Sequence, residues 1–320
     1  MIEFVLSDAD LAEVRFAVSP LHELTLSLRV VHDPGRYPLH LPWSRRLARL
    51  RPRLDMAVLG ALTNDRGWTP DFLSPRPDSP FTRIEEDLAR VRSTPPQQVR
   101  DDLHAIHGRI PTAVAGRPGR VLERIADAIE NYWHLALAEH WDRMRTILEA
   151  DIVYRGRLLT QAGLDAMFAD ISDRISFHSP VVRVRIAGVA PRRIETKGAG
   201  LTLLPTLFAL HTGVPVDPTA PPILIYAARG TGTLWETPHN TSSAALDAVL
   251  GRVRAQLLTS LTEPASSTDL ARRNGVSTSA INQHLRALRD VGLLTSTRYG
   301  RSVLYLRSEL GDALVRPQRP

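Results

Sequence analysis

The hydrophobic pattern differs between the long first part of the chain and the short last part. The first part mixes helical and strand periodicities, and the last part predicts elements that follow closely on one another. In the first part, apolar residues recur every three to four positions in several segments, as in helices that bury one face. Pro52 interrupts the third of these segments early. The predicted helices cover residues 8–15, 20–31, 45–62, 81–91, 97–106 and 120–151, the last in one or two pieces.

A second kind of pattern predicts strands in the same part of the chain. Residues 2–6 look like a short strand, and residues 181–187 alternate apolar side chains with Arg183 and Arg185. Such alternation is typical of a half-buried strand. Residues 202–210 and 223–227 are further strand candidates between proline-rich turns. Helices and strands together predict an α/β body.

Residues 243–261 carry one broad apolar face and predict a helix that opens a second domain. Glu263 and Pro264 end this helix. We therefore expect a boundary near residues 238–243, with domains at 1–240 and 241–320. The face is broad enough to serve both its own domain and a partner in a dimer. It is made of Leu246, Val249, Leu250, Val253, Leu257, Leu258 and Leu261.

Two short helices with clear termini follow. Ser266, three residues before Asp269, fits an N-terminal capping pattern. Gly275 stands where a left-handed residue is needed after the first helix, and Val276 is expected to fill the corner between the two. Ser277 is the predicted N-cap of the second helix. The pattern predicts a helix-turn-helix.

The second helix has two distinct faces. Ile281, Leu285 and Leu288 recur at helical spacing and are predicted to point inward. The outward face holds the side chains that read base edges in a DNA major groove: Asn or Gln for adenine, Arg for guanine, Ser for either. The alternative is an ordinary solvated polar face. The outward residues are Ser279, Asn282, Gln283 and Arg286.

A hairpin follows the helix pair and favours the DNA-binding interpretation. Residues 293–298 and 301–306 are β-prone runs, and Tyr299 and Gly300 lie between them as a turn. The predicted tip carries Arg298, Tyr299 and Arg301, which can contact phosphates or an adjacent groove. Arg289, further along the second helix, is expected to meet phosphate.

The charge distribution agrees with this division. Residues 266–320 hold nine arginines and four acids, a net charge of +5, whereas the whole chain carries +6. A nearly neutral body with a basic tail domain is the distribution expected when only the tail meets phosphate. Lys197 is the only lysine.

Other features of the composition exclude several classes of function. The absence of cysteine excludes disulfides, thiolate zinc sites and cysteine redox switches. The N-terminus has neither the basic nor the apolar region of a signal peptide, and no uncharged apolar run reaches about 18 residues. We expect a cytoplasmic protein with no membrane contact, no cofactor and no metal.

The C-terminal sequence resembles the winged helix of ArsR-type bacterial transcriptional regulators over residues 243–312. The residues that carry the resemblance are Thr268–Ala271, Val276–Ser277, Ile281–Leu294, Tyr299–Arg301 and Tyr305, with His284-Leu285, Leu288 and Gly292-Leu293 as the specific part. The resemblance implies a homodimer on an inverted-repeat operator in double-stranded DNA, usually a repressor released by a signal. Many members sense metal through cysteines, a role that does not carry over to this chain. About 240 further residues precede the motif.

We therefore predict an α+β protein, mostly helical, with an N-terminal α/β body and a C-terminal winged helix-turn-helix. His284 belongs to the family pattern but lies at the border of the buried face, where packing is favoured over base contact. The predicted DNA-contacting set is Thr278, Ser279, Asn282, Gln283, His284, Arg286, Arg289, Arg298, Tyr299 and Arg301.

The body offers weaker candidates for chemistry. Trp133 and Trp141, eight residues apart, could line an aromatic effector pocket for a small molecule, although a core role is favoured. His104 and His107 could bring two metal ligands together, but no third ligand is identifiable. Residues 229–233 could cradle an anion, but a plain turn is favoured.

The leading hypothesis is a sequence-specific, dimeric DNA-binding regulator and not an enzyme. One rival is an enzyme or small-molecule-binding protein that uses the winged helix only for dimerisation, which requires a cofactor loop after a strand. Another is a module that docks a protein partner through the apolar segments of residues 120–150.

Overall fold

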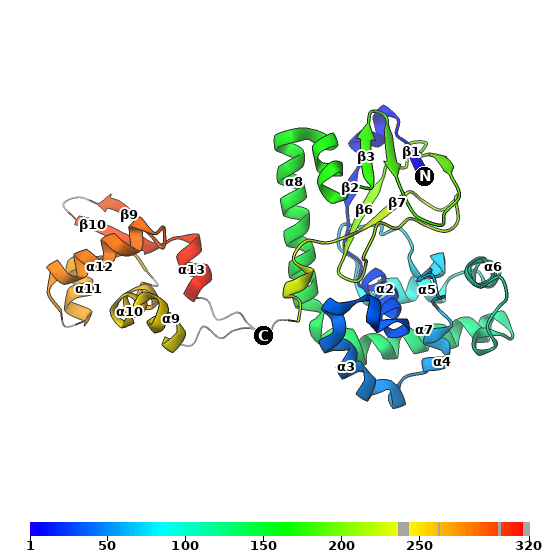
Figure 1. Ribbon diagram of the computed structural model, residues 1–320, viewed down its shortest axis with the longest axis horizontal. Coiled ribbons are helices and arrows are strands. Elements are labelled where there is room, and N and C mark those ends of the chain that lie inside the picture. Colours follow the sequence, from blue (N-terminus) through cyan, green and yellow to red (C-terminus); the bar gives the residue numbers. More distant parts are fainter. Residues whose placement is uncertain (236–242, 262, 275, 300–301, 316–320) are drawn as a thin grey trace. The chain divides into compact units, whose positions relative to one another are not determined.

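The computed structural model describes residues 1–235, 243–261, 263–274, 276–299 and 302–315 (Figure 1). The chain divides into two units, Met1–Trp235 and Glu236–Pro320. The predicted boundary between residues 240 and 241 lies outside the described residues. The architecture is α+β and mostly helical, as predicted. No helix in the described ranges is both long and apolar enough to cross a membrane.

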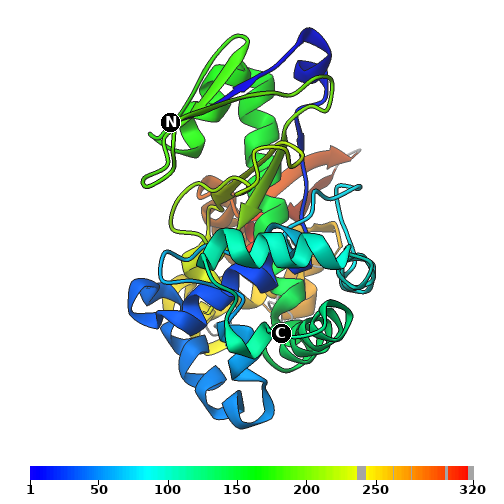
Figure 2. The ribbon, with the colours of Figure 1, turned by 90° about the vertical axis from the view of Figure 1, so that its right-hand side faces the viewer.

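The first unit contains most of its helices at one end and two small sheets at the other (Figure 2). The helices are α1 (Asp8–Ala12), α2 (Pro20–His32), α3 (Leu41–Leu50), α4 (Met56–Gly60), α5 (Ile84–Arg92), α6 (Pro96–His107), α7 (Pro118–Tyr132) and α8 (Trp141–Ile171). A π-helical turn, Trp133–Leu137, and a 3-10 turn, Ala138–His140, join α7 to α8. The helix predicted over residues 45–62 is interrupted at Pro52, so that α3 and α4 are separate helices.

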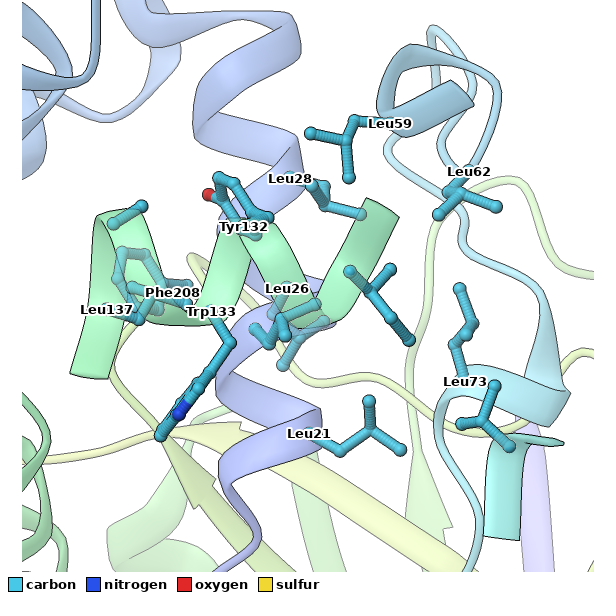
Figure 3. Close-up of a cluster of buried hydrophobic side chains, with 14 of the residues drawn as sticks. Leu21, Leu26, Leu28, Leu59, Leu62, Leu73, Tyr132, Trp133, Leu137 and Phe208 are labelled. Atoms are coloured by element: carbon cyan, nitrogen blue, oxygen red, sulfur yellow. The ribbon is translucent and has the colours of Figure 1, made fainter. Parts of the chain in front are cut away.

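Helix α2 is the centre of the larger hydrophobic core. Ser19 caps it, with Oγ accepting from the backbone N–H of His22 at 3.2 Å, and Pro20 takes the first helical position. Its leucines, among them Leu21, Leu26 and Leu28, pack with residues of α7 and the following turn (Figure 3). Ten of its thirteen residues are buried, so α2 is apolar around most of its circumference.

Helix α7 turns its apolar face into this same core. Val121, Leu122, Ile125 and Ile129 are all buried there. The apolar part of residues 120–132 is thus covered by the first unit itself. It offers no open surface of the kind that a protein-docking module requires.

Two sheets form the other end of the unit. A four-stranded sheet has the order β3-β4-β1-β5, in which only the β1–β5 pair is parallel. A three-stranded parallel sheet has the order β2-β6-β7. The bounds are β1 (Ile2–Val5), β2 (Arg15–Phe16), β3 (Ile175–His178), β4 (Val181–Val184), β5 (Arg192–Glu195), β6 (Thr202–Thr206) and β7 (Ile223–Ala227).

Helix α8 runs beside both sheets and links two hydrophobic cores (Figure 1). Met144 and Leu148 belong to the core around α2, whereas Met167 and Phe168 belong to the core of the four-stranded sheet. Gly163, with φ 83°, breaks the helical backbone between them. The prediction ended this helical region at residue 151, so its second half was missed.

The second unit is a winged helix-turn-helix. It contains α9 (Ser243–Leu250), α10 (Arg252–Ser260), β8 (Ala265–Ser266), α11 (Ser267–Asn274), α12 (Thr278–Asp290), β9 (Leu294–Tyr299), β10 (Ser302–Arg307) and α13 (Glu309–Val315). The strands form a sheet in the order β8-β10-β9, with β9 and β10 antiparallel from Tyr299 opposite Ser302 to Leu294 opposite Arg307.

Two features of this unit differ from the predictions. The helix expected over 243–261 is divided into α9 and α10 by Gly251, whose φ of 79° is incompatible with a continuous helix. Helix α13 was not predicted. Its Gly311 packs so closely on the residue before β9 that an added Cβ would collide with the carbonyl oxygen of Leu293.

Candidate nucleic-acid interface

Capping serines fix the start of both helices of the helix-turn-helix. The Oγ of Ser266 accepts from the backbone N–H of Asp269 at 3.2 Å and donates to its carboxylate at 2.7 Å. The hydrogen bond from Ser266 holds the pKa of Asp269 below its usual range. The Oγ of Ser277 accepts from Ala280 N–H at 3.2 Å. Both predicted caps are confirmed, while Gly275 lies outside the described residues.

The buried face of α12 is the predicted one. Ile281 and Leu285 are fully buried and Leu288 is 1% exposed. They belong to an aliphatic core with residues of α10 and α11. Val276 was expected to fill the corner before α12 but is 42% exposed. Val276 is therefore not part of this core, whereas Leu270 of α11 is fully buried in it.

The opposite face of α12 is open to solvent. Ser279, Gln283 and Arg286 are exposed and Asn282 is half-buried. Within the described ranges none of these four side chains makes a hydrogen bond or ion pair, so their donors and acceptors are not used internally. Thr278 at the start of the helix is also exposed.

Three other predicted contacts lie at the edges of this face or on the hairpin. His284 is half-buried, in keeping with its predicted place at the border of the packed face. Arg289 is exposed and lies 3.5 Å from the carboxylate of Asp290. Arg298 is exposed on β9. The backbone of Tyr299 pairs with β10, but its side chain, Gly300 and Arg301 lie outside the described residues.

Local ion pairs neutralise several of the charges of this unit. Asp269 pairs with Arg272, Asp290 with Arg289, and Asp312 with Arg307. Arg286 and Arg298 have no carboxylate partner among the residues that are described. Arg273 of α11, which was not among the predicted contacts, is also exposed and unpaired in that part of the chain. Positive charge thus remains available beside the polar face of α12.

The predicted effector pocket falls on residues that pack together. Trp133 is 4% exposed within the core around α2 (Figure 3), and Trp141 is half-buried against the same core. Their rings meet edge to face with centroids 5.5 Å apart. Such a pair contributes to packing. A ligand site at these two tryptophans stays a prediction.

The loop at residues 229–233 holds an anion, but that anion is a carboxylate of the same chain. The backbone N–H of Arg229 donates to Asp151 Oδ1 at 3.0 Å, and Tyr226 donates its hydroxyl to Asp151 Oδ2 at 2.7 Å. The buried Arg155 lies 3.7 Å from Asp151 and also pairs with Asp170. The loop therefore closes a buried charge cluster.

One histidine of the pair on α6 is also used internally. His107 Nε2 lies 2.9 Å from the carbonyl oxygen of Ala61, and His104 is exposed. Across the described ranges, no group of three His, Cys, Asp or Glu side chains is placed to hold a metal ion.

Comparison with protein families gives a match for each part of the chain. A helix-turn-helix domain matches residues 250–297, which include α10, α11 and α12. A family of unknown function, DUF5937, matches residues 108–232 of the first unit. No curated protein matches the chain.

Two solved structures are similar to the C-terminal part. Reduced HlyU from Vibrio cholerae N16961 is 30% identical over 24% of this chain and 84% of its own, with a TM-score of 0.20. A protein described as a "possible transcriptional regulator for arsenical resistance" is 36% identical over 23% of this chain and 76% of its own, with a TM-score of 0.19.

Proposed function

We propose, from the premise that this chain belongs to the ArsR-type winged-helix transcriptional regulators, that it represses transcription as a homodimer bound to an inverted-repeat operator. That it is a DNA-binding regulator follows from the helix-turn-helix match. The observation that carries the finer proposal is the open face of α12, whose polar side chains have no internal partners in the described ranges.

The side chains of this face suit direct reading of bases. Arg286 can form two parallel hydrogen bonds with guanine, and Asn282 or Gln283 can do the same with adenine. Ile281, Leu285 and Leu288 anchor the other side of α12, so the face is held rigidly. Each such pair contributes about 1–3 kcal/mol of discrimination between bases.

Arginines beside α12 would supply the affinity that does not depend on sequence. We expect the exposed Arg289 at the end of the helix and Arg298 on β9 to contact phosphates. Because phosphate contacts release counterions, we expect the association constant to fall steeply as salt concentration rises.

A homodimer supplies the second half-site. One recognition helix reads too few base pairs for an operator, and two helices related by a two-fold axis read half-sites about 10 base pairs apart. Val249 on α9 and Val253 on α10 are 81% and 40% exposed. These two valines, from the apolar face predicted over residues 243–261, are left for a partner subunit.

Selection of bound sequences from random duplex DNA with the full chain tests the proposal. We expect a palindromic sequence to emerge, and Arg286→Ala to weaken binding to it by about 1–3 kcal/mol while relaxing the preference at one position per half-site. Arg252→Ala is the control, because Arg252 is an exposed arginine of the same unit at the start of α10.

Two outcomes would contradict the proposal. Equal weakening by both variants, with no change in sequence preference, would mean that α12 does not read bases. A monomer at the concentrations that bind DNA, measured by sedimentation, would remove the dimer.

A further inference from the structure

The first unit contains a cavity of about 300 Å³ with a strongly basic lining. It lies between the end of α2, residues 66–69, the segment joining β4 to β5, and residues 210–216. Its size is at the lower end of the range for small-molecule sites. Asp71 is its one carboxylate, against six arginines: Arg29, Arg36, Arg66, Arg174, Arg185 and Arg192.

Asp71 does not neutralise this lining. Its two carboxylate oxygens accept from the backbone N–H groups of Val216 and Asp217 at 3.0 and 2.6 Å. Burial raises the pKa of Asp71, whereas the two amides and the charge of Arg192 oppose that rise. One carboxylate held by amides leaves a large excess of positive charge in the cavity.

Arg29 is the most informative of these arginines. It comes from the last turn of α2, and its side-chain stem packs against Gly67, whose φ is 74°. The Nε of Arg29 is buried without a hydrogen-bond partner, and Arg29 forms no ion pair with any described residue. Burial lowers the pKa of Arg29, with only Tyr37 acting in the opposite direction. Keeping such a guanidinium without a counter-charge is costly.

The remaining arginines are arranged around the cavity. Arg192 donates through its terminal nitrogens to the carbonyl oxygens of Pro215 and Val216, which fixes it in place, while its buried Nε has no partner. Arg36 and Arg174 form no ion pair within the ranges that the structure describes. Apolar side chains complete the lining, including Trp68, Ile186, Val214 and Ile225.

We propose that this cavity binds a small organic anion, whose acidic group pairs with Arg29 and whose apolar body packs against the aliphatic part of the lining. An anion would supply the partner that Arg29 lacks, and charge-assisted bonds to guanidinium are among the stronger hydrogen bonds in proteins. The site lies away from Trp133 and Trp141. Binding at this site is measured without DNA, so the outcome does not depend on the proposed operator.

Two fluorescent probes with the same rings separate charge from apolar affinity. 8-Anilinonaphthalene-1-sulfonate carries one negative charge, and N-phenyl-1-naphthylamine is its neutral counterpart. We expect the purified full chain to bind the sulfonate at least roughly tenfold more tightly than the neutral amine, because hydrogen bonds to a charged group are stronger than neutral ones. Equal binding of both probes would overturn the proposal.

Three variants locate the binding. Arg29→Met removes the buried charge at similar volume, and we expect it to weaken sulfonate binding by roughly tenfold or more. Arg36→Gln, at an exposed residue of the lining, should weaken it several-fold without a risk to folding. Arg49→Met is the control, because Arg49 is an exposed arginine of α3 outside this lining. Unchanged affinity in both Arg29→Met and Arg36→Gln would contradict the assignment.

The thermal stability of the free protein distinguishes a binding arginine from a structural one. If Arg29 serves a ligand, Arg29→Met leaves the midpoint of thermal unfolding unchanged or raises it, since an unpaired buried charge is removed. A purely structural arginine would instead lower the midpoint on substitution, and that result, together with unchanged sulfonate affinity, would refute the site.

Discussion

The two units of this chain use ionisable residues in opposite ways. The core of the first unit contains buried charged or titratable groups, including Glu23, Asp151 and Arg155. In the second unit, no charged side chain is buried among the residues described between 243 and 315, where the buried residues are aliphatic apart from Gly311 and Tyr305. Its arginines and acids lie at or near the surface. The first unit therefore depends on the pairing and protonation of buried groups, whereas the second depends mainly on packing and keeps most of its charge near the surface.

This difference has a physical consequence for what each unit can do. A buried ionisable group makes stability depend on pH or on a bound counter-ion, which is a property suited to sensing. An aliphatic core below a charged surface stays folded while the surface meets a polyanion. The stability of the first unit is thus sensitive to its surroundings, whereas the second unit keeps its charge available at the surface.

The largest expected effect comes from the buried charge cluster around Asp151. Asp151→Ala leaves Arg155 with less compensation and removes the acceptor of Tyr226 and of the Arg229 amide. We expect the first unit to lose about 3–5 kcal/mol of unfolding free energy. Asp165→Ala, an exposed acid on the same helix, should change it by less than about 0.5 kcal/mol.

Tryptophan fluorescence during urea unfolding measures this effect, because all five tryptophans precede residue 236. Similar midpoints for Asp151→Ala and Asp165→Ala would show that the cluster does not stabilise the first unit.

A substitution that creates a cavity in the core of the second unit tests how far this unit depends on packing. Leu285 is fully buried, and Leu285→Ala should destabilise the second unit by about 2–5 kcal/mol. Leu306 is 40% exposed on β10, so Leu306→Ala is the control and should destabilise the second unit by less than about 1 kcal/mol. Hydrogen exchange of peptides from α12 measures the change. If Leu285→Ala also lowers the stability of the first unit by the same amount, as measured by tryptophan fluorescence in urea, the two units do not unfold separately.

The pH dependence of the first unit depends on Glu23. Its carboxylate accepts from the backbone N–H of Leu207 at 3.1 and 3.2 Å, and burial raises its pKa to about 8 from an ordinary 4.5. Between these values the folded state holds a proton that the unfolded state has lost, so stability falls as pH rises. We expect a fall of roughly 1.5 kcal/mol between pH 6.5 and 8.

Glu23→Gln should remove that fall, as followed by tryptophan fluorescence in urea at several pH values. Burial lowers the pKa of His22 and of His40 to about 4, so their stabilising contributions are lost only as pH falls below 6.5. These two histidines therefore do not contribute to the pH dependence of stability above pH 6.5. An unchanged slope in Glu23→Gln would assign the effect to another group. The second unit should show no comparable slope there.

The smallest expected effect distinguishes a residue that stabilises α12 from a residue on its open face. Ser277 caps the helix, so Ser277→Ala should cost about 1 kcal/mol of stability in the second unit. Ser279, two residues later, is exposed with no internal bond in the described ranges, and Ser279→Ala should leave stability unchanged within about 0.5 kcal/mol. Hydrogen exchange across α12 distinguishes the two; equal losses would mean that Ser279 has a structural role.

Sequence reasoning succeeded where one residue pattern determines one element. The run at 223–227 coincides with β7, because a strand covered on both faces is apolar throughout. In α12 the inward and outward faces follow directly from the spacing of Ile281, Leu285 and Leu288. The caps at Ser266 and Ser277 were also predictable, since these bonds join residues three apart.

Sequence reasoning failed where the place of an element depends on residues that are distant in the sequence. Helix α8 packs Leu148 into one core and Phe168 into another, so no single apolar stripe continues past Gly163. Strand β5, Arg192–Glu195, has a polar sequence and is placed by pairing with β1. The basic cavity was not predicted because its arginines come from separate segments and meet only in the folded unit.

The separation of the two faces of α12 has a consequence for how such a regulator changes over time. Three aliphatic side chains hold the helix in place, so the four positions on its open side can be exchanged with little effect on folding. A new target sequence can then arise by single substitutions, each of which leaves a folded protein. The specificity of the molecule can diverge while its scaffold stays the same.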